Sequence, residues 1–229
     1  MLLSARSNAH KEYGKVAPMH IGGGKPIGRL ALVLMAPALV ATTGCSSSSS
    51  GKAPEIDAPV ASAHAMDQFD ANKDGAIEIS ELADCPALAA ALPSFDSSGD
   101  GRLEASEIAK GLEQMYASRK SLTEMTCTVT LKGRTLVGAN VRLRPLEMLS
   151  ELPPAEGVTD ESGTVHPAVS ADLVPTEFKH KALMYPGLYR VEITHDQSQL
   201  PGRYNTATEL GCQVNPVARD GMAARFDLK

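Results

Sequence analysis

Residues 69–81 read FDANKDGAIEISE and residues 95–108 read FDSSGDGRLEASEI, so the chain contains one pattern twice. Each copy starts with Phe-Asp, places oxygen-bearing side chains at alternate positions, and has a Glu eleven residues after its first Asp. Gly75 and Gly101 occupy the same place in the two copies. A glycine tolerates positive φ, so the backbone can bend sharply there. A sharp bend surrounded by oxygen atoms predicts a loop that holds a cation.

The spacing of these oxygens suits a calcium ion, which takes six to eight oxygen ligands at about 2.3–2.6 Å. The predicted ligands of the first loop are the side chains of Asp70, Asn72, Asp74 and Glu81 and the backbone carbonyl of Ala76. Those of the second loop are the side chains of Asp96, Ser98, Asp100 and Glu107 and the backbone carbonyl of Arg102. Glu78 and Glu104 are expected to contribute through a water molecule. Glu81 and Glu107 close the two shells with both carboxylate oxygens.

The repeated pattern resembles the EF-hand family over about residues 60–118. Asp, Asn and Gly also cluster in ordinary turns, but two tandem copies with one spacing favour metal loops. The second copy departs at Ser98, where Asp or Asn is usual. The resemblance implies Ca²⁺ as the cofactor and a small all-α EF-hand pair at residues 59–120. Ile77 and Leu103 are the apolar residues expected to pair between the loops.

The two loops begin 26 residues apart, at Asp70 and Asp96, which is closer than in the usual EF-hand pair. The helices between them must therefore be short. The first is expected from Ser80 to about Asp84, and Pro86 can begin a second that runs through Leu92. Such close loops also resemble dockerin modules, which bind a partner domain, although dockerin loops usually end in Asp.

Composition excludes some classes of partner. The chain has 229 residues, a formal net charge of −5, 43% hydrophobic and 4% aromatic residues, and no Trp. Nucleic-acid binding needs concentrated Lys and Arg, and the part expected to fold has no such cluster. Few aromatic side chains are available to stack on bases or sugars. The length allows one ordinary domain and a smaller one.

The first 45 residues read as an export signal. Lys25 and Arg29 precede the apolar run 30–41, which is too short to span a bilayer comfortably. The run is followed by Thr42-Thr43-Gly44-Cys45 and five serines, which resembles the lipobox of bacterial lipoproteins with Thr42 in place of the usual Leu. The resemblance implies lipidation at Cys45, a membrane anchor and a flexible tether at 46–58. The alternative is a soluble secreted protein, and either Met1 or Met19 can be the start.

From Met125 the period of apolar residues changes to two, as in half-buried strands. The alternating runs contain Val129, Val141, Val191, Cys212 and Phe226, with turn signals between them. Strands without intervening helices predict an all-β antiparallel sandwich at 125–229. The fold class is thus multidomain, with the α-helical pair first and the sandwich second.

The segments around Gly138-Ala139-Asn140-Val141, residues 157–163 and residues 186–191 resemble the carboxypeptidase-regulatory or transthyretin-like sandwich. That family usually provides structural or binding modules in bacterial envelope proteins. The resemblance implies no catalytic residues.

Cys127 and Cys212 fall on inward positions of their strands, so an exported sandwich allows a disulfide between them. The alternative is that both are small buried hydrophobic residues. The six histidines form no HxxH or HxxxH pair, and no nucleophile motif or nucleotide-binding loop is present.

These features favour a non-enzymatic, calcium-binding protein that is exported to the cell envelope, on a lipid-anchored membrane surface or in the periplasm. The alternative is a calcium-dependent adaptor that recruits a protein partner in a dockerin-like way. A third reading, an enzyme with its site in the sandwich, lacks candidate residues.

Overall fold

The computed structural model describes residues 54–117 and 121–229. The first helix, α1 (Ala58–Phe69), begins where the Asp57 side chain accepts a hydrogen bond from the Val60 N–H at 3.1 Å. Pro59 lies in the first turn, where its lack of a backbone N–H costs no intrahelical hydrogen bond. The helix ends at Phe69, so Asp70 follows directly as the first residue of the predicted cation loop.

The short helices expected between the loops are α2 (Ile79–Leu82) and α3 (Pro86–Phe95). Pro86 lies in the first turn of α3, as predicted. The helix nevertheless continues through Pro93, three residues beyond the expected end at Leu92. Burial of Phe95 offsets the hydrogen bond that Pro93 cannot donate. The last helix, α4 (Ala105–Ala117), buries Ile108, Leu112 and Met115 among other residues.

The loop pair is not purely α-helical. The strands β1 (Ala76–Ile77) and β2 (Leu103–Glu104) pair antiparallel between the two loops. Their backbone groups satisfy one another at the point where neither loop is helical. The expectation of an all-α pair is therefore corrected to helices joined by a two-stranded sheet.

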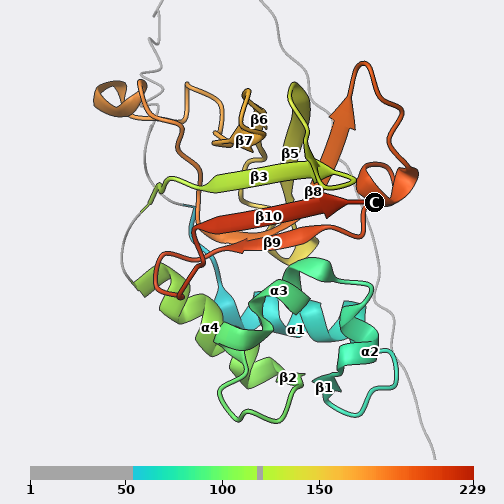
Figure 1. Ribbon diagram of the computed structural model, residues 1–229. Coiled ribbons are helices and arrows are strands. Elements are labelled where there is room, and N and C mark those ends of the chain that lie inside the picture. The colour runs from blue at the N-terminus through green and yellow to red at the C-terminus, as the bar shows by residue number, and fades with distance from the viewer. Residues whose placement is uncertain (1–53, 118–120) are drawn as a thin grey trace, which may run out of the picture. The chain divides into compact units, whose positions relative to one another are not determined.

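The C-terminal part is mostly β and forms two four-stranded sheets (Figure 1). One sheet contains β3 (Thr126–Leu131), β4 (Arg134–Thr135), β7 (Thr164–Val165) and β10 (Ala223–Leu228). The other has the order β6 (Ala155–Val158), β5 (Ala139–Pro145), β8 (Gly187–His195) and β9 (Gly211–Val214). Short 3₁₀ turns lie at η1 (Glu147–Leu149), η2 (Thr176–Phe178) and η3 (Gly202–Tyr204).

One strand pair departs from the expected antiparallel arrangement. β10 runs parallel to β3, with Phe226 opposite Val129, whereas the other pairs named above are antiparallel. A parallel pair requires a long connection between its strands, and here almost the whole β part lies between β3 and β10. The period-two pattern identifies strands but carries no information on their direction.

Alternate residues of the strands face the core, as the sequence predicts. In β5, Val141 and Leu143 are buried while Arg142 and Arg144 are exposed. The buried residues of both sheets belong to one hydrophobic cluster, which also includes Leu88 of α3. All described residues fall within a single compact unit, Ser46–Lys229.

The helices contact the sheet through α3 and β9. The Ser94 hydroxyl donates to Gln213 Oε1 at 2.9 Å, and Gln213 Nε2 donates to the Ala90 carbonyl at 3.2 Å. Gly211 lies so close to α3 that a Cβ on it would be 2.3 Å from the Ala87 backbone nitrogen. Tyr116 of α4 adds a hydrogen bond from its hydroxyl to the Pro186 carbonyl at 3.0 Å. The loop pair is thus fastened directly to the sheet.

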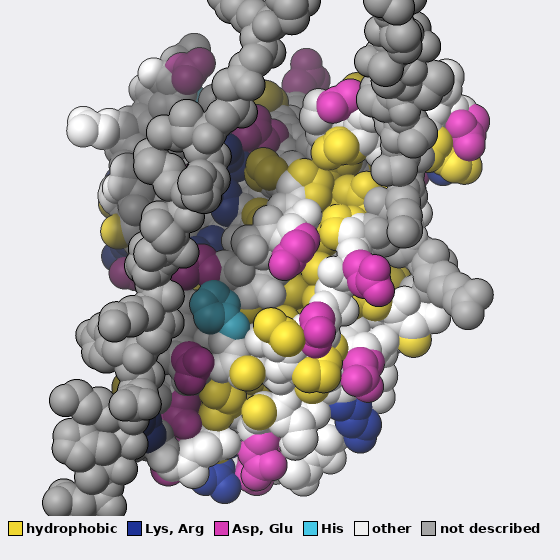
Figure 2. Space-filling view, turned by 180° about the vertical axis from the view of Figure 1, so that it is seen from behind, with side chains coloured by type: hydrophobic (Ala, Val, Ile, Leu, Met, Phe, Trp, Pro, Cys, Tyr) yellow, Lys and Arg dark blue, Asp and Glu magenta, His cyan; other side chains and the backbone are white. Residues whose placement is uncertain are grey.

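Figure 2 shows the opposite face, where acidic side chains are spread among hydrophobic ones over the part that is visible, in keeping with the net charge of −5. None of the helices in the described ranges is both long and apolar enough to cross a membrane. The predicted export signal, the lipidation site Cys45 and most of the tether at 46–58 lie outside the described residues.

The structure contains no disulfide between Cys127 and Cys212, although the strand pattern allows one. Cys85, Cys127 and Cys212 are free and buried. Burial raises the pKa of Cys127 to about 12, and burial followed by the nearby Cys127 raises that of Cys212 well above its ordinary value. Since the thiolate is the reactive form, the raised pKa values slow the oxidation of Cys127 and Cys212.

We expect both Cys127 and Cys212 to be recovered as free thiols. Alkylation with N-ethylmaleimide in denaturant without reductant, followed by peptide mass mapping, should find the label on each. Under native conditions the same labelling should be slow, because both side chains are buried. A peptide pair linked through these two residues would show that the protein oxidises at this position.

Candidate metal centre

The first loop connects α1 to α2 and is bent around the carboxylate of Asp70. This carboxylate accepts hydrogen bonds from the N–H groups of Asp74 at 3.2 Å and Gly75 at 3.0 Å. Gly75 has φ of +94°, which a residue with a Cβ rarely adopts. The sharp bend predicted at this glycine is therefore present.

The middle of the first loop brings Asn72 and Asp74 together. Asn72 Oδ1 accepts the Asp74 N–H at 2.8 Å, and Asn72 Nδ2 donates to Asp74 Oδ2 at 3.2 Å. Asp74 Oδ1 accepts the N–H of Ala76 at 3.1 Å. The predicted ligands at the third and fifth positions of the loop thus lie against each other.

Glu81 reaches from α2 back across the loop. Its Oε1 accepts the N–H groups of Ala71 at 2.8 Å and Asn72 at 3.2 Å, and its Oε2 accepts the Glu78 N–H at 2.9 Å. The hydrogen bond from Glu78 is the largest cause that holds the pKa of Glu81 below its usual range. An ionised carboxylate that spans the start and end of the loop is the closing ligand that a calcium loop requires.

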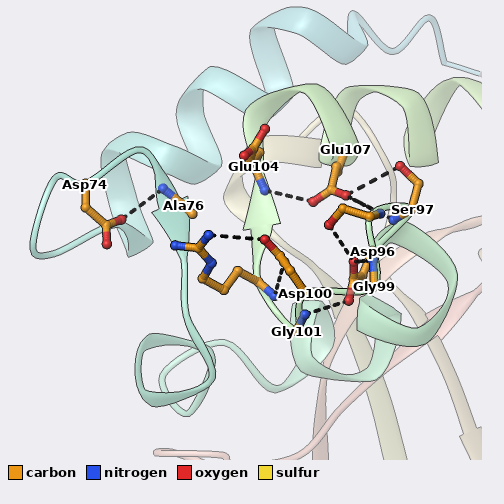
Figure 3. A network of polar contacts seen from close by, with 11 residues as sticks. Asp74, Ala76, Asp96, Ser97, Gly99, Asp100, Gly101, Glu104 and Glu107 are labelled. Atoms are coloured by element: carbon orange, nitrogen blue, oxygen red, sulfur yellow. Dashed lines mark hydrogen bonds and ion pairs between the residues drawn. The ribbon is translucent and has the colours of Figure 1, made fainter.

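The second loop, between α3 and α4, repeats this arrangement (Figure 3). Asp96 accepts the N–H groups of Gly99 at 2.6 Å and Gly101 at 2.9 Å, and also the Ser98 hydroxyl at 3.1 Å. The Gly101 hydrogen bond is the main cause of a lowered pKa at Asp96. Asp100 Oδ1 accepts the N–H of Arg102 at 3.0 Å.

Glu107 closes the second loop as Glu81 closes the first. Its Oε1 accepts the N–H groups of Ser97 at 3.0 Å and Ser98 at 2.9 Å, while its Oε2 accepts the N–H of Glu104 at 3.2 Å. Burial raises the pKa of Glu107, but these hydrogen bonds together outweigh it and leave the pKa lowered. A buried carboxylate that stays ionised needs such donors or a cation.

The two loops are held to each other by β1 and β2. Ile77 lies opposite Leu103, and both side chains are fully buried. This is the pairing that the sequence predicts for these two residues. The carbonyl donor of each loop, Ala76 or Arg102, precedes the apolar residue of that pair directly. A shift in one loop must therefore disturb the backbone of the other.

These donors fit a hard cation. They are carboxylate, amide, hydroxyl and carbonyl oxygens, without sulfur or imidazole, and such a set suits calcium rather than zinc. Within residues 54–117 and 121–229 no three His, Cys, Asp or Glu side chains converge as a ready-made metal cluster. Each predicted ligand set includes three carboxylates, and the structure does not gather them around one point: Asp70, Asp74 and Glu81 in the first loop, and Asp96, Asp100 and Glu107 in the second. A calcium ion would have to draw them together with Asn72 and the Ala76 carbonyl in the first loop, and with Ser98 and the Arg102 carbonyl in the second.

Two features of the loops were not predicted from the sequence. The side chain of Arg102 pairs with Asp100, although only its carbonyl was expected to matter. The fourth position of each loop is also left-handed, with φ of 58° at Lys73 and 77° at Gly99. The glycine at position 99 could have predicted this conformation, but the lysine at position 73 does not favour it.

A comparison with protein families finds the EF hand at residues 63–85, which include the second half of α1, the entire first loop and α2. This match supports calcium as the ligand of the first loop. No curated protein and no solved structure matches the chain.

Proposed function

We propose that this protein is a non-enzymatic calcium-binding protein in which two EF-hand loops hold one Ca²⁺ each and fix the helices against the β part. The observation that carries the proposal is the repeated loop geometry, in which Glu81 and Glu107 each reach back to the second and third residues of their own loop. The family match supports the first loop, and the same contacts extend the proposal to the second.

Within the first loop, Asp70, Asn72, Asp74 and Glu81 would hold the ion with their side chains, and Ala76 with its carbonyl. The ion would supply positive charge to carboxylates that now accept backbone N–H groups. Because Asp70 directly follows α1 and Glu81 lies within α2, a bound ion would also fix the angle between the two helices.

The proposal includes an exported, envelope-anchored location. It rests on the apolar run 30–41 and on Gly44-Cys45 before the serine tract. Extracellular EF-hand modules bind calcium weakly, with dissociation constants of about 10⁻⁴–10⁻³ M. We therefore expect both loops in the range of about 10⁻⁵–10⁻³ M. The β part would serve as a structural or binding module.

Isothermal titration of the full chain with CaCl₂, after removal of metal with a chelator, tests the proposal. We expect two ions per chain, and much weaker heats with MgCl₂ because Mg²⁺ demands a smaller octahedral site. If neither heat nor a change in backbone amide signals appears up to 10 mM calcium, the proposed function is wrong.

Removal of calcium should lower thermal stability. A ligand that binds only the folded state at 100 times its dissociation constant stabilises that state by about 2.7 kcal/mol. For a chain of this size, that corresponds to a rise of roughly 5–10 °C in Tm for each site. Differential scanning calorimetry in excess calcium and in EDTA measures the difference, with MgCl₂ as the ionic-strength control. Equal Tm values would mean that calcium leaves the fold unaffected.

A further inference from the structure

The two loops differ at the residue that follows the glycine of the bend. In the second loop this residue is Arg102, and it occupies both oxygens of Asp100. The Arg102 N–H donates to Oδ1 at 3.0 Å, and its guanidinium NH2 lies 3.2 Å from Oδ2. The dashed lines at Asp100 in Figure 3 mark these contacts.

The first loop has no such cation. Its equivalent residue is Ala76, whose N–H donates to Asp74 Oδ1 at 3.1 Å. The other oxygen of Asp74 accepts the neutral amide of Asn72 at 3.2 Å. Asp74 is therefore open to an incoming cation without the loss of an ion pair, whereas Asp100 is not.

The Arg102 guanidinium is also attracted by carboxylates of the first loop. Its hydrogen bond and charge interaction with Asp100 are the main reasons that its pKa is raised, and the charges of Asp74 and Glu78 add to the effect. The guanidinium thus lies where carboxylates of both loops attract it. The strand pairing of Ala76 with Glu104 explains this proximity, because it aligns the two loops side by side.

We propose that the Arg102 side chain acts as an internal counter-cation that lowers the calcium affinity of the second loop, so that the two loops fill at different calcium concentrations. This inference rests on the proposed function. For Asp100 to become a ligand, calcium must displace the guanidinium from Oδ2. Ser98, which replaces a charged or amide ligand in the same loop, acts in the same direction.

The exposure of the Arg102–Asp100 ion pair sets the expected size of its effect on calcium affinity. The side chains of Arg102 and Asp100 are 44% and 39% exposed, so water and salt screen their interaction. Loss of the pair should raise calcium affinity at the second loop by about threefold to tenfold at low salt, and less at high salt. The Arg102 carbonyl, the predicted ligand, remains in any substitution.

The experiment compares full-length wild type with Arg102→Ala, Arg102→Lys and Arg219→Ala. Arg102→Ala gives the second loop the residue that the first has, and Arg102→Lys keeps the charge. Arg219 lies outside both loops and its side chain is 97% exposed, so Arg219→Ala controls for the loss of one positive charge. The Gly75 and Gly101 amides donate to Asp70 and Asp96, so their signals in ¹⁵N NMR report each loop separately.

In wild type we expect the Gly75 signal to respond at lower calcium concentration than the Gly101 signal. Arg102→Ala should shift the Gly101 midpoint to lower calcium by about threefold to tenfold at 20 mM KCl, with a smaller shift at 300 mM. Arg102→Lys should lie near wild type, and Arg219→Ala should leave both midpoints unchanged. If the Gly101 midpoint is the same in Arg102→Ala and wild type, the inference is wrong while the proposed function stands. If wild type itself shows no calcium response, the proposed function fails.

Discussion

Glu81→Gln is expected to abolish calcium binding at the first loop while the second loop still binds. Glutamine keeps one side-chain oxygen, which can still accept the Ala71 and Asn72 N–H groups, so the loop should fold. It removes the charge and the second oxygen that a bidentate ligand needs. Mutation of residues that only support a ligand weakens metal binding by about 10–100-fold, so loss of the ligand itself should cost at least about 100-fold.

Calorimetric titration of Glu81→Gln should give one ion per chain in place of two. The matched control is Glu113→Gln on the exposed face of α4, which removes the same charge outside the loops and should retain two sites. Circular dichroism checks that both variants are folded. A Glu81→Gln protein that binds two ions with wild-type affinity would show that calcium does not use this loop as assigned.

The bend of each loop and the return of its closing Glu could be predicted from the sequence because a loop is a local structure. Asp70, Asp74 and Glu81 lie within twelve residues, and the spacing alone decides which oxygens can converge. The pairing of Ile77 with Leu103 could also be predicted, since both are apolar residues at equal positions in two similar loops. These predictions do not depend on the rest of the chain.

Contacts between distant segments could not be predicted in the same way. Nothing in the run from Ala223 to Leu228 indicates that β10 pairs parallel to β3. Strand direction depends on the path of the connecting chain, which a period of two does not encode. The Arg102 side chain was missed for a related reason, because its contact with Asp100 depends on the loop conformation and not on the ligand signature.

The close packing of α3 on β9 is another feature that the sequence does not predict, and it is centred on Gly211. In a strand, glycine usually marks a bulge or a close approach of another backbone. Here it is a close approach: a Cβ would lie 2.3 Å from the Ala87 nitrogen and 2.6 Å from the Pro86 carbonyl carbon. Both neighbours are backbone atoms, so no side-chain rotation can relieve the clash.

Gly211→Ala should therefore destabilise the protein strongly. The first turn of α3 must move away from the sheet, which weakens the Ser94–Gln213 and Gln213–Ala90 hydrogen bonds. Overpacking of this kind costs about 1–3 kcal/mol and occasionally more, and we expect about 3 kcal/mol because backbone must move on both sides. That loss corresponds to a fall in Tm of roughly 6–12 °C.

Gly202→Ala is the matched control. A Cβ at Gly202 would have only the Thr206 hydroxyl nearby, at 3.3 Å, so its stability should stay within about 0.5 kcal/mol of wild type. Urea denaturation in saturating calcium measures both variants, and a repeat in EDTA shows whether calcium in the loops compensates for a loosened α3. If the two alanine variants were equally stable, the close contact at Gly211 would not hold in solution, and the loop pair would not be fastened to the sheet there. The loss expected only at Gly211 thus measures how firmly the two loops are joined to the β part.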